Sequence, residues 1–479
     1  MQQHSLDFLF HPKSIAVVGA SNNPETHGYN HLNFQLSYGF KGKIYPINPR
    51  HTEILGLRAY PSLESIPGTI DHVICAIGIN NVPDLLTQAS HKGVKSMHIY
   101  SGRASETGRP EAKKLDKEIL RLAQEYNIRI VGPNSLGLFC PRSGLSLGYD
   151  FPKEPGSVGA IMQSGANSTD LGHFAALRGV RFSKIASYGN ALDINEIDLL
   201  KYFSEDRETK VILCYIEGLR SDPEKFLELV RKAAQQKPFI ICKGGRSKAG
   251  ARFTLGHTAS QADIGGEIWG APLRQAGAIL VRNLDELLDM AVAFSLLPAI
   301  KGNRVGTGGG GGGNIVLYAD EWEEAGFEIP PLPQEIREEF KRRGSQSWDW
   351  IKNPADFSIV APGDAFTVPA ALMEMAKHPD FDFIVGYVGE DFPFTIASLY
   401  RTLLSEVEGY IKVSKESNKP FFAIVRSRPL GIGEFTGQRH RVYAQARTRF
   451  LEEGVPFFTT VDGAANAVKE QIDYYQRKG

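Results

Sequence analysis

Residues 14–20, SIAVVGA, decide the fold of this chain. The run is short, apolar and rich in β-branched residues, and it ends in glycine, as does a typical strand buried on both faces of a parallel sheet. A helical pattern follows from about Tyr29 to Tyr38, and further strand candidates alternate with helical patterns along the chain. This alternation predicts an α/β fold of doubly wound parallel sheets.

Three passages of this kind are predicted. The chain has 479 residues, and a prior of roughly 150 residues per domain suggests about three domains. We place them at residues 1–150, 151–300 and 301–479, with LLPAIKGN as the last linker. The strands expected in the third domain are NIVLYA (314–319), DFIVGYVGE (382–390), KPFFAIVRS (419–427) and PFFTTV (456–461).

The composition narrows the class of protein. The 54 basic and 54 acidic side chains balance, which favours neither a nucleic acid nor a membrane surface as partner. No apolar run has the length of a membrane span, and the N-terminal residues lack the pattern of a secretory signal. The four cysteines form no CxxC pair, so we expect reduced thiols in a cytoplasmic protein and no metal site.

The turn after the first strand is a candidate phosphate site. Glycine lets the backbone approach a phosphate, and the next helix begins close behind it, although the GxGxxG fingerprint is absent and a plain turn is an equal alternative. Cations near the end of the second strand suit a phosphorylated ribose, as in NADP or coenzyme A. The residues assigned to this crevice are Gly19, Ala20, Ser21, Asn22, Lys43, Asn48, Arg50, Ser101 and Asn134.

The second domain contains a histidine between small residues, His257, after a strand that ends in Lys243. A single loop histidine is more often structural than catalytic. Two further features point to catalysis. Gln163, Ser164, Gly165 and Ala166 begin a helix and form a second candidate anion site. Glu217 ends a neighbouring strand, where a carboxylate can hold one imidazole nitrogen and leave the other nucleophilic.

These stretches resemble the α-subunit part of the NDP-forming acyl-CoA synthetases, a family related to succinyl-CoA synthetase. The matching segments occur in the family's order and are SIAVVGAS, KGKIYPINPR, GPNSLGL, QSGA, SYGNALDINEIDLL, YIEG, KGGRSKAGAR, GHTAS and NPADF. The resemblance implies a Rossmann-like CoA-binding domain followed by two flavodoxin-like ligase domains. It implies that His257 is transiently phosphorylated, that Glu217 is its partner and that Ser164 and Gly165 hold the phosphate.

In this family, acyl-CoA, ADP and phosphate are converted reversibly to acid, CoA and ATP. The resemblance therefore implies acyl-CoA, coenzyme A and phosphate as ligands of this chain. No GxxxxGK[ST] loop or ATP-grasp-like domain is found, so ATP or ADP and Mg are expected on an ATP-grasp β subunit in an α2β2 assembly. The alternatives are an NADP-dependent oxidoreductase and a non-catalytic CoA or acyl-CoA sensor.

Two departures from the family pattern stand out. Six glycines, Gly308 to Gly313, replace a shorter turn at the start of the third domain, and we favour a flexible turn over a phosphate site there. Arg103 follows Ser101-Gly102 and alters the region expected to hold the thioester.

Overall fold

Strand β1 (Ser14–Val18) is buried along its whole length. It pairs in parallel with a strand on each side, and its side chains point alternately into two hydrophobic cores. Ile15 and Val17 face one core, and Ala16 and Val18 face the other. The prediction of a strand buried on both faces is therefore confirmed. The computed structural model describes residues 6–258, 268–356, 364–389, 396–425 and 438–478.

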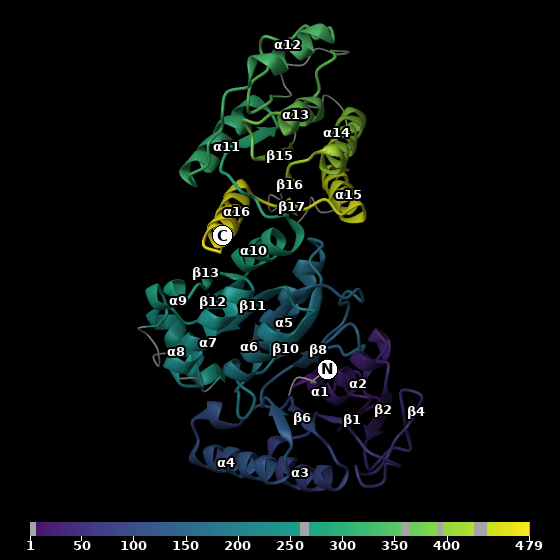
Figure 1. The fold of residues 1–479 in the computed structure, drawn as a ribbon. Helices are drawn as coiled ribbons and strands as arrows, with labels where there is room; N and C mark the ends of the chain where they lie inside the picture. The colour runs from purple at the N-terminus through teal and green to yellow at the C-terminus, as the bar shows by residue number, and fades with distance from the viewer. Residues whose placement is uncertain (1–5, 259–267, 357–363, 390–395, 426–437, 479) are drawn as a thin grey trace. The chain divides into compact units, whose positions relative to one another are not determined.

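The first sheet is parallel and has the order β2-β1-β5-β6-β7. Its switch point lies between β1 and β5, because the chain adds β2 on one side of β1 and the remaining strands on the other. Helices α3 and α4 lie side by side against one face (Figure 1). The other elements here are β2 (Lys43–Ile47), β5 (His72–Cys75), β6 (Ser96–Ile99), β7 (Arg129–Val131), α1 (Asp7–Phe10), α2 (His27–Tyr38), α3 (Val82–His91), α4 (Pro110–Glu125), η1 (Ile79–Asn81), η2 (Ser105–Thr107) and the hairpin β3 (Glu53–Ile54) and β4 (Leu57–Arg58).

The second sheet has the order β13-β12-β11-β9-β10-β8, and only the edge strand β8 is antiparallel. Its switch point lies between β9 and β11. Sequence patterns did not predict β8, which is only three residues long. The elements are β8 (Gly137–Phe139), β9 (Val158–Met162), β10 (Phe182–Ser187), β11 (Val211–Ile216), β12 (Phe239–Lys243), β13 (Ile279–Val281), α5 (Gly165–Ala176), α6 (Glu196–Glu205), α7 (Pro223–Gln236), α8 (Lys248–Thr258), α9 (Ala271–Gln275) and α10 (Leu284–Leu296).

The third sheet, β14-β15-β16-β17, is parallel. Here the prediction of a strand over 314–319 is wrong, because these residues belong to helix α11. Ile315, Tyr318 and Trp322 are buried at helical spacing, whereas Val316 and Leu317 are 62% and 57% exposed. The elements are β14 (Val305–Gly308), β15 (Phe383–Val388), β16 (Phe421–Val425), β17 (Phe457–Phe458), α11 (Gly312–Glu324), α12 (Gln334–Arg342), α13 (Val368–Lys377), α14 (Ile396–Glu416), α15 (Gln438–Glu453) and α16 (Val461–Gln476).

The chain divides into two compact units, residues 1–287 and 288–479. The first unit contains the first two sheets. They are joined by strand β8, which follows the last strand of the first sheet in sequence but pairs with β10 of the second sheet. Arg129 in β7 also reaches across to Asp193 at 2.9 Å and to Asp198 at 3.2 Å. None of the helices in the described parts is both long and apolar enough to cross a membrane.

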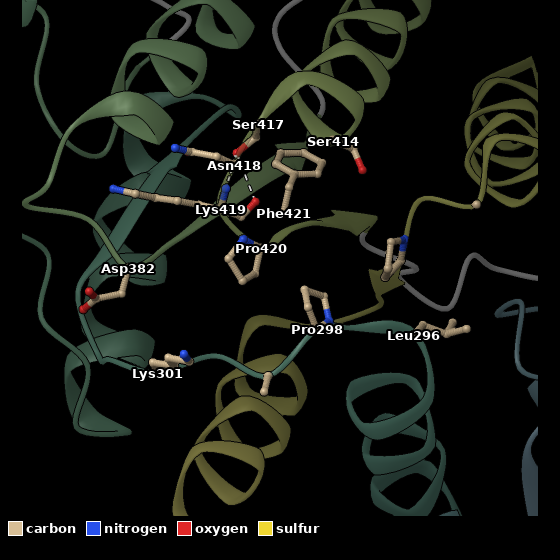
Figure 2. A pocket seen from close by; sticks show the side chains of 13 residues that line it. Leu296, Pro298, Lys301, Asp382, Ser414, Ser417, Asn418, Lys419, Pro420 and Phe421 are labelled. Atoms are coloured by element: carbon tan, nitrogen blue, oxygen red, sulfur yellow. Dashed lines mark hydrogen bonds between the residues drawn. The ribbon is translucent and has the colours of Figure 1, made fainter. Parts of the chain in front are cut away.

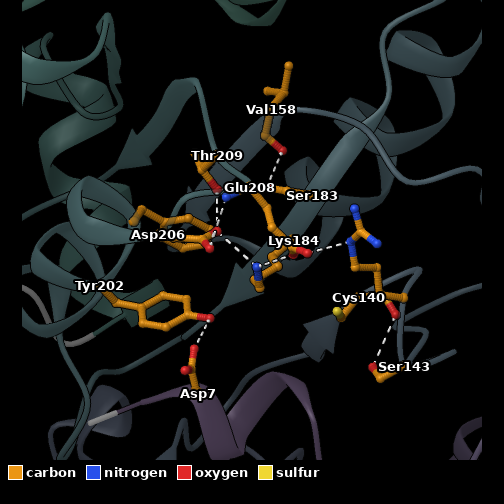
Figure 3. A network of polar contacts seen from close by, with 12 residues as sticks. Asp7, Cys140, Ser143, Val158, Ser183, Lys184, Tyr202, Asp206, Glu208 and Thr209 are labelled. Atoms are coloured by element: carbon orange, nitrogen blue, oxygen red, sulfur yellow. Dashed lines mark hydrogen bonds and ion pairs between the residues drawn. The ribbon is translucent and has the colours of Figure 1, made fainter. Parts of the chain in front are cut away.

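A polar network around Lys184 joins β10 of the second sheet to the segment that follows α6 (Figure 3). The side chain of Lys184 is 1% exposed, and its ammonium contacts Asp206 at 2.9 Å and Glu208 at 2.8 Å. Burial raises the pKa of Asp206, but the hydrogen bonds from Lys184 and Thr209 outweigh burial and lower it below its ordinary value. Lys184 is therefore held as a buried cation between two carboxylates.

Replacement of Lys184 by methionine is expected to destabilise the first unit. The change leaves Asp206 and Glu208 without their shared cation, and removal of one partner from a buried pair costs about 3 kcal/mol. Chemical unfolding followed by circular dichroism measures this loss. The matched control is Lys232→Met, which removes an exposed pair with Glu228 and should change stability by less than about 1 kcal/mol. Equal effects of the two substitutions would contradict the prediction.

Candidate functional site

The first crevice lies at the carboxyl end of β1, where the chain turns through Gly19. Gly19 has a φ of 86°, and a Cβ on Gly28 would lie 1.8 Å from the Gly19 carbonyl oxygen. The turn therefore passes directly over the first residues of α2. Thr26 caps this helix by accepting from the backbone N–H of Tyr29 at 3.3 Å. The backbone of the turn and the start of α2 are therefore in close contact.

Two asparagines hold this turn in place. The Asn48 amide donates to the carbonyl of Ala20 at 2.8 Å, and its oxygen accepts from the backbone N–H of Arg50 at 2.9 Å. The Asn22 amide likewise donates to the backbone carbonyl of Glu53, and its oxygen accepts from the backbone N–H of Leu55, both in the β3–β4 hairpin. Asn22 and Asn48 therefore position the backbone of the turn with their side chains.

The structure separates Lys43 from the other crevice residues. Lys43 pairs with Ser14 at the start of β1, whereas Ile47 pairs with Val18 at its end. Four residues of strand span about 13 Å. Lys43 therefore lies at the amino ends of the strands, whereas Arg50 lies beyond their carboxyl ends. The expectation that Lys43 joins the crevice is wrong, because the strand continues from Lys43 toward the crevice. Arg50 is exposed at the correct edge.

Ser101 and Asn134 meet after β6 and β7. The backbone N–H of Asn134 donates to the carbonyl of Ser101 at 3.1 Å, and the Asn134 amide donates to Asn190 at 3.3 Å. Asn190 in turn donates to Glu106 at 2.7 Å. The hydroxyl of Ser101 is buried without a hydrogen-bond partner among the described residues. Glu106 was not predicted from the sequence, and no motif marks it.

Glu106 also shapes the turn that contains Arg103. One oxygen of Glu106 accepts from the backbone N–H groups of Arg103 at 2.5 Å and Ala104 at 3.1 Å. Arg103 has a φ of 67°, which non-glycine residues rarely adopt. The backbone of this turn is therefore held in an uncommon conformation next to Ser101.

The second site lies at the switch point between β9 and β11. Gln163, the residue after β9, is 1% exposed, and its side-chain oxygen accepts from the backbone N–H of Glu217 at 2.6 Å and of Gly218 at 3.1 Å. Two N–H donors require the oxygen at that position, so the NH₂ group points elsewhere. It is buried without a partner among the described residues.

Helix α5 begins beside this amide. Ser164 caps it by accepting from the backbone N–H of Asn167 at 3.4 Å, and Ala166 lies exposed in the first turn. A Cβ on Gly165 would lie 2.7 Å from the side chain of Leu136. Glycine at this position therefore lets the helix start approach the segment before β8. The predicted group of Gln163, Ser164, Gly165 and Ala166 lies together at one strand end.

Glu217 is 4% exposed at the end of β11. Its carboxylate accepts from the hydroxyl of Tyr215 at 3.2 Å, and the ammonium of Lys243 donates to its backbone carbonyl at 2.8 Å. Burial and the nearby Glu217 charge raise the pKa of Tyr215 above its ordinary value. A Cβ on Gly244 would lie 2.6 Å from the Tyr215 hydroxyl, so this glycine keeps the turn open.

The backbone of His257 belongs to the last turn of α8 and not to a loop as expected. Its side chain lies outside the described residues. Helix α8 begins shortly after β12 and packs beside η2, which contains Glu106. The helix therefore connects the strand ends of the second sheet with the region around Ser101.

A histidine cluster that the sequence patterns did not indicate lies near the first crevice. The rings of His31 and His98 are 5.4 Å apart, and Tyr100 packs against His31 at 4.8 Å and against His27 at 4.5 Å. His98 Nε2 lies 2.9 Å from the carbonyl of Ser135. Burial lowers the pKa of His98 to about 4 and that of His31 well below its ordinary value.

In the second unit, the glycine run joins β14 to α11. Gly308 ends β14, and Gly309 and Gly310 have φ values of 105° and 78° before α11. A Cβ on Gly309 would lie 2.2 Å from the carbonyl oxygen of Tyr387. Positive φ and the contact with Tyr387 explain glycine at position 309, and the flexible turn favoured from the sequence stays a prediction.

The cavity in Figure 2 lies at the end of this sheet that is opposite to the glycine turn. It has a volume of about 560 Å³, and its lining residues include Lys301, Asp382, Lys419 and Pro420. Asp382 directly precedes β15 and Pro420 directly precedes β16. The cavity therefore lies at the amino ends of the strands, whereas ligands of open α/β sheets bind beyond the carboxyl ends.

Comparisons with known proteins define the class. A CoA binding domain matches residues 13–141, and a succinyl-CoA ligase like flavodoxin domain matches residues 155–294. The α subunit of ADP-forming acetate–CoA ligase II from Pyrococcus furiosus is 34% identical over 421 residues, which are 88% of this chain and 89% of the relative. ADP-forming acetate–CoA ligase I subunit α of the same organism is 33% identical, covering 79% of this chain and 82% of the relative.

The solved structures agree with these relatives. Acetyl-coenzyme A synthetase 1 of Ca. Korarchaeum cryptofilum, in complex with phosphate and ADP, superimposes with a TM-score of 0.79 at 28% identity, covering 99% of this chain and 98% of that chain. The fold and these matches place the chain among the acid–thiol ligases. It belongs to the family of ADP-forming acyl-CoA synthetases, whose reaction is reversible, and the predicted fold class and family are confirmed.

The buried histidines predict a dependence of stability on pH. Burial lowers the pKa of His72 to about 3 and of His98 to about 4, whereas the unfolded value is 6.5. The unfolded chain therefore binds more protons below pH 6.5. As the pH falls below 6.5, each such histidine therefore lowers the free energy of unfolding by about 1.4 kcal/mol per pH unit. This loss ends when the pH reaches the folded pKa.

Unfolding by denaturant between pH 7 and 5 measures this slope. We expect His98→Asn to reduce the slope relative to the wild type, because one titrating group is removed. His91→Asn should keep the wild-type slope, since His91 is an exposed residue at the end of α3. A slope that His98→Asn leaves unchanged would contradict the assignment.

Proposed function

We propose that this chain carries out the acyl-CoA and phosphoryl-transfer steps of its family's reaction and that His257 is the transiently phosphorylated residue. The observation that carries the proposal is the unpartnered buried NH₂ group of Gln163. It lies at a sheet switch point, between the start of α5 and the turn of Glu217. A buried donor without an acceptor is costly, and a phosphate oxygen supplies the acceptor.

The proposed reaction has three steps. A phosphate oxygen attacks the thioester carbonyl, so that a C–O bond forms, the C–S bond breaks and CoA leaves. The imidazole of His257 then attacks phosphorus in the acyl phosphate, and the free acid leaves. Finally the phosphoryl group passes from His257 to ADP, which regenerates the imidazole. Neutral imidazole is a good nucleophile near pH 7 and forms a reactive phosphoramidate.

The phosphate cradle consists of Gln163, Ser164, Gly165 and Ala166. The first N–H groups of α5 have no partner within the helix and carry partial positive charge. Together with the Gln163 amide they stabilise the developing negative charge of the transferred group. Glu217 is the carboxylate that orients the imidazole of His257, and its burial at a neighbouring strand end supports that role.

Coenzyme A occupies the first crevice. The turn of Gly19, Ala20 and Ser21 holds its phosphates, and the exposed Arg50 faces its phosphorylated ribose. The buried hydroxyl of Ser101, next to Asn134, supports the placement of the thioester at this end of the sheet. Because α8 packs beside η2, the segment with His257 starts within reach of both sites. The sequence predicts Asn22 and Asn48 as CoA-binding residues, and their bonds to the backbone support a role in positioning the turn.

The nucleotide and Mg bind to an ATP-grasp β subunit, and the assembly is α2β2. Two relatives are named as α subunits, which supports the need for a partner subunit. The four cysteines are free and buried, which supports a reducing compartment such as the cytoplasm. The relatives support neither an NADP-dependent oxidoreductase nor a non-catalytic sensor. We retain 1–150, 151–300 and 301–479 as the proposed domains.

His257→Ala is expected to abolish labelling of this chain. The complex with the partner subunit is incubated with labelled ATP and Mg, and the label on this chain should be acid-labile and base-stable, as expected for a phosphohistidine. His91→Ala, which removes an exposed histidine, should label as the wild type does. Equal labelling of His257→Ala would refute the assignment.

Gln163→Glu is expected to raise the KM for phosphate by about tenfold or more, because it replaces the unpartnered NH₂ group with a carboxylate oxygen that repels the anion. The acceptor for the N–H groups of Glu217 and Gly218 is kept, so folding should persist. The measurement is phosphate-dependent acyl-CoA cleavage. Gln235→Glu on the exposed side of α7 is the matched control, and equal KM values for both variants would contradict the prediction.

A further inference from the structure

A separate cavity of about 380 Å³ lies at the carboxyl ends of β12 and β13, within the first unit. This volume is at the lower end of the range of small-molecule sites. Neither the proposed phosphate cradle nor the CoA crevice includes it. Its polar lining residues are Lys243, Arg246, Arg274, Arg282 and Trp269, and its apolar floor contains Ile241, Leu273, Leu280 and Val281.

The charge of this cavity has one sign. Its lining contains four cationic side chains and, among the described residues, no carboxylate. Arg282 is paired with Glu286 just outside the lining, with Nε and Oε1 2.5 Å apart. Arg246 donates one N–H to the carbonyl of Arg282 at 2.8 Å. For Arg246 and Arg274 the described parts of the chain provide no carboxylate partner, so both guanidinium groups keep donors for a ligand.

Trp269 adds a further donor. Its indole nitrogen is buried, and no described residue accepts a hydrogen bond from it. The indole ring packs against the ring of Phe226, with the two centroids 6.4 Å apart. The ammonium of Lys243 lies 5.1 Å from the centroid of the indole. The indole therefore lies in the lining of the cavity, and no acceptor for its N–H is found in the described part of the chain.

We propose that this cavity binds a small phosphate monoester with a compact apolar body. Three oxygens of a phosphate can accept from Arg246, Arg274 and Trp269 together, whereas a carboxylate has only two oxygens. A dianion also matches an excess of positive charge better than a monoanion does. The apolar body of the ligand packs against Leu280, the half-buried apolar side chain of the lining. This site goes beyond the proposed function and does not depend on it.

The test uses the full chain and three probes: phenyl phosphate, inorganic phosphate and benzoate. Calorimetry and tryptophan fluorescence measure binding. We expect phenyl phosphate to bind more tightly than inorganic phosphate, which lacks the apolar body, and more tightly than benzoate, which lacks the third oxygen. Trp269→Phe should remove the fluorescence change. Arg274→Gln should weaken binding by about tenfold, the equivalent of about 1.4 kcal/mol.

Matched controls separate this site from the others. Arg231→Gln changes an exposed arginine of α7 and should leave the affinity for phenyl phosphate unaltered. Gln163→Glu, which acts in the proposed cradle, should also leave it unaltered, so failure of one proposal does not imply failure of the other. The proposal is overturned if Arg274→Gln and Arg246→Gln both bind phenyl phosphate as the wild type does, or if benzoate binds equally well.

Discussion

The site in the first unit depends on the side-chain amide of Gln163. Its oxygen accepts from two successive backbone N–H groups, those of Glu217 and Gly218, and so joins the ends of β9 and β11 at the switch point of the sheet. The same two bonds determine where the NH₂ group points. One residue therefore sets the separation of the α5 start and the Glu217 turn, and presents a donor between them.

The two sheets of the first unit are held together by hydrogen bonds and ion pairs of charged side chains, and by strand β8, which follows the first sheet in the chain but belongs to the second. Arg129 pairs with Asp193 and Asp198, and the hydroxyl of Tyr202 donates to Asp7 at 3.0 Å. Strand β8 follows β7 of the first sheet in sequence and adds an edge strand to the second sheet. The distance between the crevice at Gly19 and the turn at Glu217 is thus set within one folded unit. For the proposed reaction this lowers the entropy cost of bringing the reacting groups together.

Much of this fold could be predicted from the sequence because buried parallel strands are apolar along their whole length, as β1 and β11 are. The same rule failed at residues 314–319. There the helix start follows the strand after only a short glycine turn, and the strand itself, β14, contains two glycines among its four residues. The expected strand is apolar and β-branched, yet burial follows helical spacing. Composition alone does not distinguish the two for so short a run.

The candidate site was predictable to the extent that it lies at strand ends. Glu217 and Gln163 follow neighbouring strands, so their convergence follows from a parallel sheet. Lys43 is close to Arg50 in sequence but not in space, because most of strand β2 lies between them. Glu106 and the bonds of Gln163 could not be predicted, since they join segments that are 84 and 54 residues apart. Only the packed structure brings such side chains together.

Two of the anion sites proposed for the first unit, the cradle at α5 and the cavity beside β13, differ in a way that suits different tasks. The cradle at α5 consists of backbone N–H groups and a neutral amide, with the Glu217 carboxylate nearby, whereas the cavity beside β13 is lined by full cations. Neutral donors hold a phosphoryl group without a strong ion pair, so the group can leave again. Guanidinium groups form charge-assisted bonds that retain their ligand. Lys243 lies between the two sites, but its ammonium donates to the backbone carbonyls of Glu217 and Gly244, so it supports the turn of the cradle from the cavity side.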